Sequence, residues 1–328
     1  MLKNSKFARN RALVVGSVAY DVIFDIHGQI KNNIVVEAGK AGRQNLMFTA
    51  KTKQQHYGGA GANIAYGLGL LGVKPILFSS VGKDFKPDFH KHLKSHGVDV
   101  RVHIEKKNWT ATFYGMSDDV REQIGVWQPN AHDMLDSVSI ADTLDKKTLQ
   151  SVSVAIFHGQ PSVPLRHMRD VRKILGKNVT IIFDPGQNMT LYDKTALETC
   201  LSFADILILN DVEFSQALKI LHCQREDIFK FGPRTIIETK GEEGSVVYEW
   251  GKITSIPARK VSKVVEATGA GDAYRAGLIY GLLEGVDLAS ACRIGAYLGA
   301  KNVETRGGQN YTLNTRELDA ALEAQNFT

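Results

Sequence analysis

The sequence predicts a doubly wound α/β protein, with a mainly parallel β-sheet flanked by helices. Short runs rich in Val, Ile and Leu alternate with helical segments along most of the chain. Most of these runs are continuously apolar, as expected for parallel strands that are buried on both faces. The runs are LVVGSV at 13–18, PILFSSV at 75–81, VSVAIF at 152–157, VTIIF at 179–183, DILIL at 205–209, RTIIET at 234–239 and SVVYEW at 245–250.

Two stretches break this pattern and predict a small antiparallel sheet outside the main body. Residues 22–57 and 100–127 contain alternating segments (QNLMFTAKT, VRVHIE and TATFYGM) and no convincing helix. We expect them to form a β-sheet lid over a cleft, while 12–21, 58–99 and 128–328 form the α/β core. The alternative is a pair of long loops at one edge of the main sheet. Exposed lid edges also predict pairing between two subunits, which would give a homodimer.

Composition and charge exclude several classes of protein. With 328 residues, 43% hydrophobic and 23% charged, the chain can bury one large core or two smaller ones. The net charge of +5 is small, and no run of Lys and Arg is interleaved with aromatic residues, so nucleic acid is not expected as the main partner. No stretch of 18 apolar residues exists, so no membrane span is expected.

The cysteines and the N-terminal segment predict a cytoplasmic protein. Cys200, Cys223 and Cys292 are far apart and show no CxxC spacing, which argues against disulfides or a zinc site and favours a reducing compartment. The first apolar run stops at Asp21 and lacks a cleavage site, so we interpret it as a strand and not as a signal peptide.

Residues 264–285 (VVEATGAGDAYRAGLIYGLLEG) carry the strongest local signal for a functional site. They predict a short strand at Val264, a turn at 269–271 and a helix that begins with Asp272. Glycines at a helix start allow close backbone approach, and the unpaired N–H groups of the first turn favour an anion. A carboxylate there can accept the proton of an attacking hydroxyl. The alternative is that Thr268 and Asp272 only cap the helix.

Polar residues follow several other predicted strands, where ligands of open α/β sheets gather. Ser17 and Asp21 follow the first strand, and an Asp-Pro-Gly-Gln-Asn segment at 184–188 follows VTIIF. Asn210 and Glu213 follow DILIL. Each has a structural explanation, because Asp-Pro-Gly favours a turn and Asn210 with Glu213 has the spacing of a capping box. Together they predict the rim of a site.

Three glycine-rich segments have different meanings. GLGLLG at 67–72 matches the dinucleotide pattern GxGxxG, but it ends a helical segment and precedes a strand, so we reject it as a cofactor motif. GGAGAN at 58–63 opens a helix and places Asn63 where it can bond ligand hydroxyls. TKGEEGS at 239–245 is expected to be a hairpin, with nucleotide contact as the alternative. GxxxxGK[ST], HExxH and GxSxG are absent, which excludes a Walker-type site and argues against the common metalloproteases and hydrolases.

With these segments in order, the chain resembles the ribokinase-like (phosphofructokinase-B) family of carbohydrate and nucleoside kinases over residues 12–310. Glu266 to Tyr274 (EATGAGDAY) stands where the family has DTTGAGDxF, and GGAGAN matches its N-terminal signature. GSVAYD (16–21), FDPGQN (183–188) and ETRGGQNY (304–311) resemble the bacterial adenosine kinases within it. The resemblance implies a ribokinase-like fold with a small β lid. It also implies ATP- and Mg²⁺-dependent phosphorylation of the 5′-hydroxyl of adenosine or a broader set of nucleosides.

The resemblance also assigns roles to individual residues. Asp272 would be the base, and the amides of Gly269, Ala270 and Gly271 would receive the charge of the moving phosphoryl group. On the nucleoside side, ribose contacts would come from Asp21, Asn63 and Gly59, purine contacts from Ser17, Gln187 and Asn188, and base stacking from Phe113 or Trp127. On the nucleotide side the residues would be Asn210, Glu213 (near magnesium, through water), Thr239, Gly241 and Gly244.

Some features depart from the family or favour other functions. Glu266 and Ala267 replace the usual Asp and the usual Thr or Pro beside the place where related enzymes hold a monovalent cation, which leaves potassium activation open. A kinase of the same fold acting on a free sugar such as ribose would share the ribose contacts. A nucleotide-binding sensor without catalysis is a third hypothesis, against which the retained Asp272 argues.

Overall fold

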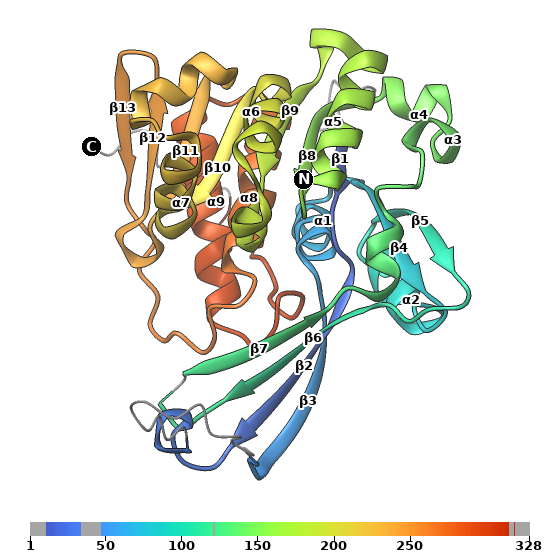
Figure 1. Cartoon of the computed structure of the whole chain (residues 1–328), viewed down its shortest axis with the longest axis vertical. Helices are drawn as coiled ribbons and strands as arrows, with labels where there is room; N and C mark the ends of the chain where they lie inside the picture. Colours follow the sequence, from blue (N-terminus) through green and yellow to red (C-terminus); the bar gives the residue numbers. More distant parts are fainter. Residues whose placement is uncertain (1–10, 34–46, 121, 315–317, 319–328) are drawn as a thin grey trace.

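The computed structural model describes residues 11–33, 47–120, 122–314 and 318, and it contains two separate sheets. A nine-stranded sheet flanked by helices forms the main body, and a four-stranded sheet extends from one end of it (Figure 1). This confirms the α/β fold with a small second sheet. Among the described residues, no helix is both long and apolar enough to cross a membrane.

The main sheet has the order β13-β12-β11-β10-β9-β8-β1-β4-β5. From β11 to β5 all neighbours are parallel, whereas β12 and β13 add two antiparallel strands at one edge. Each of the seven apolar runs predicted from the sequence supplies one strand of this sheet. The strands are β1 (Arg11–Val15), β4 (Ile76–Gly82), β5 (Asp99–Glu105), β8 (Val152–His158), β9 (Thr180–Asp184), β10 (Ile206–Asn210), β11 (Thr235–Thr239), β12 (Ser245–Glu249) and β13 (Lys252–Ile256).

Two hydrophobic cores cover the two faces of the main sheet, because successive strand residues point to opposite sides. In β9, Ile182 belongs to one core, and Ile181 and Phe183 belong to the other. The first core is closed by α1 (Ala60–Leu70), α8 (Ala270–Glu284) and α9 (Leu288–Val303), and the second by α5 (Ser162–Leu175), α6 (Lys194–Phe203) and α7 (Asp211–Leu221).

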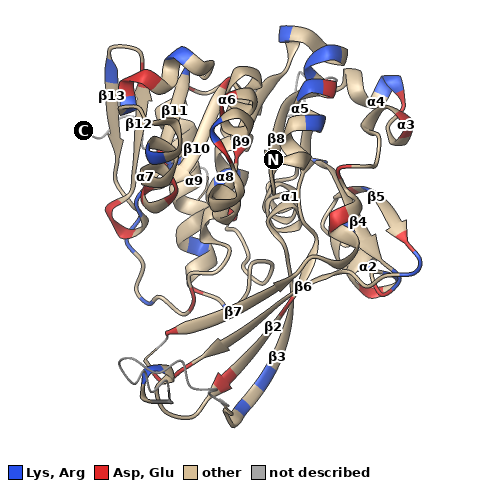
Figure 2. Cartoon of the chain, viewed as in Figure 1, with Lys and Arg blue, Asp and Glu red and all other residues tan. Residues whose placement is uncertain are grey.

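Shorter helices complete the main body and its connections. They are α2 (Asp88–Ser95), α3 (Ile140–Thr143), α4 (Lys146–Gln150), and the 3-10 turns η1 (Ile30–Asn33), η2 (Asn130–Met134), η3 (Gly176–Asn178), η4 (Gly186–Leu191), η5 (Arg225–Phe231) and η6 (Gly241–Glu243). In the ribbon of Figure 2, basic and acidic residues are interspersed along the chain.

The small sheet has the order β3-β2-β6-β7, with β2 (Ala19–Ile26), β3 (Ala50–Gly58), β6 (Ala111–Ser117) and β7 (Gln123–Gln128). Its outer pairs are antiparallel, as expected, and its central pair β2–β6 is parallel. Only residues 16–18 separate β1 of the main sheet from β2, and Gly59 alone separates β3 from α1. Two of the connections between the small sheet and the body are therefore very short.

Three predictions about local structure were wrong or incomplete. The segment VRVHIE lies in β5 of the main sheet, parallel to β4, and its alternation reflects a half-buried edge strand. The small sheet begins at Ala19, inside the segment that we assigned to the core. Val264 is not in a strand, because the adjacent amides of Val265 and Glu266 both donate to the Val303 carbonyl at the end of α9. Part of the predicted segment QNLMFTAKT (44–46) lies outside the described residues.

The glycines of α8 allow it to lie directly against α9. A Cβ added at Gly277 would lie 2.7 Å from the backbone N and Cα of Gly295, and one at Gly281 would lie 2.6 Å from Ala291 Cα. Gly285 ends the helix in the left-handed region, with φ of 71°. The four-residue glycine spacing is thus explained by helix packing and a helix end.

We predict that Gly277→Ala destabilises the protein by about 1–3 kcal/mol. The new methyl group would meet backbone atoms, which cannot move aside as the end of a side chain can. Chemical denaturation measures this change. Gly299→Ala in α9 is the matched control, since its Cβ would approach one atom only, Ala270 O at 3.3 Å. Equal stability of the two variants would contradict this account of the packing.

Candidate active site

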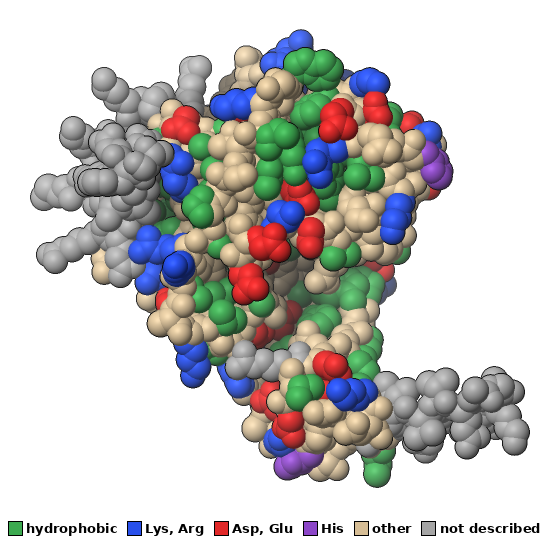
Figure 3. Space-filling model, turned by 90° about the vertical axis from the view of Figure 1, so that its left-hand side faces the viewer, with side chains coloured by type: hydrophobic (Ala, Val, Ile, Leu, Met, Phe, Trp, Pro, Cys, Tyr) green, Lys and Arg blue, Asp and Glu red, His purple; other side chains and the backbone are tan. Residues whose placement is uncertain are grey.

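The order of the main sheet brings the polar strand ends into one row. Thr239 ends β11 opposite Asn210 of β10, and Asp184 ends β9 opposite His158 of β8. Ser17 follows β1, the next strand in the row. Residues far apart in the sequence therefore share one edge, as expected for the carboxyl ends of parallel strands. Figure 3 shows the surface hollowed where the small sheet leaves the main body.

The turn at 269–271 before α8, called here the glycine corner, lies close to another stretch of backbone and has no side-chain cap. Gly269 is the N-cap with φ of 83°, and no side chain caps this helix. The capping alternative for Thr268 and Asp272 is therefore wrong. A Cβ at Gly269 would lie 2.7 Å from Gly308 Cα, so only glycine fits. The Ala270 amide donates to the Ala267 carbonyl at 3.1 Å and closes the turn.

Asp272, in the first turn of α8, meets Asn63, in the first turn of α1. Asn63 Nδ2 donates to Asp272 Oδ2 at 2.8 Å. Burial raises the pKa of Asp272 above its usual value, whereas the Asn63 bond and the nearby His158 and Arg275 oppose that rise. A carboxylate with a raised pKa is a better proton acceptor than an ordinary one.

Ser17 and Gly59 shape the start of α1. The Ser17 hydroxyl accepts from the Ala60 amide at 3.0 Å, and the Ser17 carbonyl accepts from the Ala62 amide at 3.1 Å. Gly59 has φ of 86°, and a Cβ there would lie 2.7 Å from the Ser17 carbonyl. The close approach that Gly59 permits is thus to the chain itself, at the junction of the two sheets.

Asp21 reaches the same site from the small sheet. A Cβ at Gly58 would overlap its carboxylate, so the first glycine of GGAGAN leaves room for Asp21. Burial, followed by the charges of Asp272 and Glu266, raises the pKa of Asp21 to about 7. Asp21, Asp272 and Glu266 are therefore a group of mutually repelling acids.

A buried ion pair that the sequence analysis did not predict lies beside this group. Arg275 Nη2 donates to Asp184 Oδ1 at 2.8 Å, its Nε bonds Asp184 Oδ2, and His158 Nδ1 lies 3.1 Å from Asp184 Oδ2. Burial opposes ionisation of Asp184, but Arg275 and His158 hold its pKa well below the usual range. Burial lowers the pKa of His158 and Asp184 raises it, with a net upward shift. The available signal was a charged residue within the largely apolar α8 sequence.

The predicted nucleotide-contacting residues lie at the other end of the row. Asn210 and Glu213 form a capping box at the start of α7, with bonds of 2.7 and 2.8 Å, so the structural interpretation of their spacing is confirmed. The segment 239–245 is the predicted hairpin between β11 and β12. A Cβ at Gly241 would meet open space, whereas one at Gly244 would lie 2.1 Å from the Ile256 carbonyl.

The aromatic candidates lie beside Asp21 in the small sheet, and the amide candidates lie at the end of β9 in the main sheet. Phe113 pairs with Asp21 across β2–β6 and with Trp127 across β6–β7, so all three side chains lie on one face of the small sheet. Gln187, exposed, and Asn188, half-buried, lie in η4 directly after β9.

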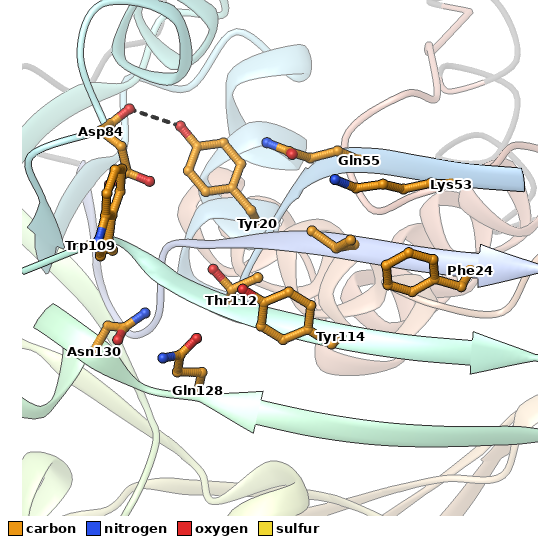
Figure 4. A pocket seen from close by; sticks show the side chains of 11 residues that line it. Tyr20, Phe24, Lys53, Gln55, Asp84, Trp109, Thr112, Tyr114, Gln128 and Asn130 are labelled. Carbon is orange, nitrogen blue, oxygen red and sulfur yellow. Dashed lines mark hydrogen bonds between the residues drawn. The ribbon is translucent and has the colours of Figure 1, made fainter. Parts of the chain in front are cut away.

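A pocket of about 440 Å³ opens on the opposite face of the small sheet (Figure 4). Tyr20, Thr112 and Gln128 are paired across neighbouring strands and point into it, one residue out of step with Asp21 and Phe113. Asp84 and Trp109 close it at the main body. No residue of the glycine corner lines this pocket, so it is separate from the site of Asp272.

The loop 304–311 supplies further contacts that the sequence analysis noted only as a likeness. The Gly307 amide donates to Glu266 Oε2 at 3.2 Å, and Gln309 Nε2 donates to Asn63 Oδ1 at 2.9 Å. Asn310 Nδ2 lies 3.3 Å from His56 Nδ1 of β3. This loop therefore contacts the corner, α1 and the small sheet together.

Comparison with known proteins gives the family. The family model described as pfkB family carbohydrate kinase matches residues 9–316, and the chain belongs to this family. A nucleoside kinase of Methanocaldococcus jannaschii is 30% identical, over 90% of this chain and 91% of that protein. A nucleoside kinase of Methanothermobacter thermautotrophicus is also 30% identical, over 95% and 96%.

A solved structure of a nucleoside kinase of Burkholderia thailandensis with inosine has a TM-score of 0.82 and 28% identity, covering 97% of this chain and 98% of that one. The protein is thus a kinase with the ribokinase-like fold.

We predict that Asp21→Asn stabilises the protein more at pH 8 than at pH 5. Folded Asp21 binds its proton up to a pKa of about 7, against 3.8 for the ordinary group, so the parent protein loses stability as pH rises between these values. At about 1.4 kcal/mol per pKa unit, the gain at pH 8 amounts to a few kcal/mol. Denaturant titrations of both proteins at the two pH values measure it, and parallel pH dependences would contradict the assignment.

Proposed function

We propose that this kinase transfers the γ-phosphoryl group of ATP to the 5′-hydroxyl of adenosine or of a broader set of nucleosides. The observation that carries the proposal is the position of Asp272, which lies at the N-terminus of α8, bonded to Asn63 and near Asp21. The names of the relatives support a nucleoside as acceptor, and another structure of the Burkholderia thailandensis enzyme is described as a complex with ADP-inosine.

The nucleoside would lie between the small sheet and the edge of the main sheet. Asp21 and Asn63 would bond the ribose hydroxyls, and Asn63 Nδ2 has a second hydrogen beyond the one given to Asp272. Ser17, Gln187 and Asn188 would face the purine. An aromatic residue on Asp21's face of the small sheet, Phe113 or Trp127, would stack on the base.

In the transfer step, Asp272 would accept the proton of the 5′-hydroxyl as that oxygen attacks phosphorus. The amides of Gly269, Ala270 and Gly271 and the positive end of α8 would receive the charge of the moving phosphoryl group. The Ala270 amide would exchange its bond to Ala267 for this contact. Thr239, Gly241 and Gly244 of the β11–β12 hairpin, together with Asn210, would contact the nucleotide.

The residues fit a magnesium ion that is held mainly by water and phosphate. Among the described residues no group of three or more His, Cys, Asp or Glu side chains is arranged to hold a metal. Glu213 would hold Mg²⁺ through water, and its buried carboxylate has a raised pKa because of burial and the charge of Asp184. When bound, the ion would neutralise phosphate charge.

A monovalent cation is not included in the proposal. The Glu266 carboxylate, which stands where the family usually has Asp, accepts a bond from the Gly307 amide and so links the corner directly to the loop 304–311. A homodimer through the small sheet and a cytoplasmic location stay predictions.

We predict turnover when adenosine, inosine and ribose are each supplied with ATP and Mg²⁺, with the nucleosides preferred. Transfer of label from γ-labelled ATP measures the reaction. A preference for ribose would support a sugar kinase instead. ATP binding without transfer to any acceptor would support the non-catalytic sensor.

We predict that Asp272→Asn lowers kcat by about 10²–10⁴-fold, the usual contribution of a general base, and leaves ATP and nucleoside binding largely intact. Calorimetric binding and steady-state kinetics separate the two effects. Turnover at the parental rate would remove Asp272 from the mechanism.

A further inference from the structure

A chain of hydrogen bonds leads from Asp272 to a histidine on α2, outside the residues that would contact substrate. Asn63 Nδ2 donates to Asp272 Oδ2 at 2.8 Å, and Gln309 Nε2 donates to Asn63 Oδ1 at 2.9 Å. Gln309 Oε1 lies 3.1 Å from His92 Nε2. Asn63 and Gln309 are 4% and 2% exposed, so water does not replace these bonds.

The direction of every bond in this chain follows from the chemistry of its ends. An ionised carboxylate only accepts, so Asn63 must present Nδ2 to Asp272 and Oδ1 to Gln309. Gln309 must then present Nε2 to Asn63 and Oε1 to His92. Because an amide oxygen only accepts, His92 must carry its hydrogen on Nε2. A reversed amide anywhere would place two acceptors or two donors against each other.

The surroundings hold His92 in this orientation. Its ring stacks on Tyr66 of α1 with 5.5 Å between centroids and lies 4.6 Å from the ring of Tyr57 of β3. The ring of His96, the residue that follows α2, lies 4.7 Å away between centroids. Burial and His96 lower the pKa of His92 while its bond to Gln309 opposes this, so the ring is neutral near pH 7 and one nitrogen donates.

We propose that Gln309 and His92 are positioning residues for Asp272, because they fix the Asn63 amide so that it occupies Oδ2 and leaves Oδ1 to receive the proton of the attacking hydroxyl. The inference rests on the proposed function of Asp272 as base. Without the relay, Asn63 Oδ1 has lost its donor and the amide can turn away from Asp272, so the carboxylate loses a bond that lowers its pKa.

Two variants remove the relay and a third controls for packing. Gln309→Met keeps the length of the side chain and loses both bonds, whereas His92→Phe keeps the stacking and loses the donor. His96→Phe is the control for packing, since the His96 ring also packs at a tilt against Tyr66 and His92, and its only bond to His92 is from Nδ1 to the backbone carbonyl, outside the chain of bonds to Asp272. His92→Gln restores a donor.

We expect Gln309→Met to lower kcat roughly tenfold, within the contribution of a general base, with a smaller change in KM. The acid limb of the kcat profile should move to higher pH, because Asp272 holds its proton more tightly. His158, Arg275, Asp184 and Asp21 also face Asp272, and all of them remain in each variant. His92→Phe should also lower kcat and move the acid limb to higher pH. His96→Phe and His92→Gln should leave both unchanged.

The same shift should appear without turnover, as a higher pKa of the Asp272 carboxyl group in an NMR titration of the free protein. The carbon signal of this group is identified because it is missing in Asp272→Asn. The relay would be overturned if folded Gln309→Met and His92→Phe had the same kcat, the same acid limb and the same Asp272 titration as the parent protein. Equal effects of His92→Phe and His96→Phe would also overturn it. If Gln309→Met does not fold, the two histidine variants decide. A parent protein inactive on every acceptor would count against the proposed function, while the NMR titration would still test the relay.

Discussion

Compensation of buried negative charge is the constraint on which the site depends. Asp184, Glu213 and Asp272 all lie within the electrostatic reach of Arg275, which is itself 6% exposed. Removing one partner of a buried pair typically costs about 3–5 kcal/mol, because the other charge is left without compensation. The guanidinium is planar and binds Asp184 through two nitrogens, so it fixes the end of β9 relative to the first turn of α8. The same cation limits the repulsion between Asp272 and Asp184.

The second feature of the site is that it is assembled where two sheets meet. Asp21 comes from the small sheet, Asn63 from the helix that follows that sheet, and Asp272 from the distant α8. Only residues 16–18 lie between β1 and β2, and only Gly59 lies between β3 and α1, so the small sheet is directly continuous with the start of α1. The loop 304–311 touches β3, Asn63 and Glu266 together, which ties the small sheet to the glycine corner.

The raised pKa values have a common physical origin. Asp21 and Asp272 are both taken out of water near other carboxylates, and the structure relieves only Asp272 with a hydrogen bond and nearby cations. Burial and neighbouring carboxylates therefore favour the protonated form of Asp21, whereas Asn63, His158 and Arg275 offset part of this effect at Asp272.

By itself the sequence determined the type of fold, the corner at 269–272 and the row of polar strand ends, because each depends on local periodicity, glycine conformation and the parallel arrangement of strands. It could not assign β5 to the main sheet, because apolar and polar residues alternate in an edge strand of the main sheet just as they do in a strand of a small lid. Only the tertiary structure decided that Arg275 pairs with Asp184, 91 positions away, and that Gln309 reaches Asn63 across 246 positions. Amide and guanidinium groups carry no periodic signal, so their partners are set by the packing of α1, α8 and the C-terminal loop.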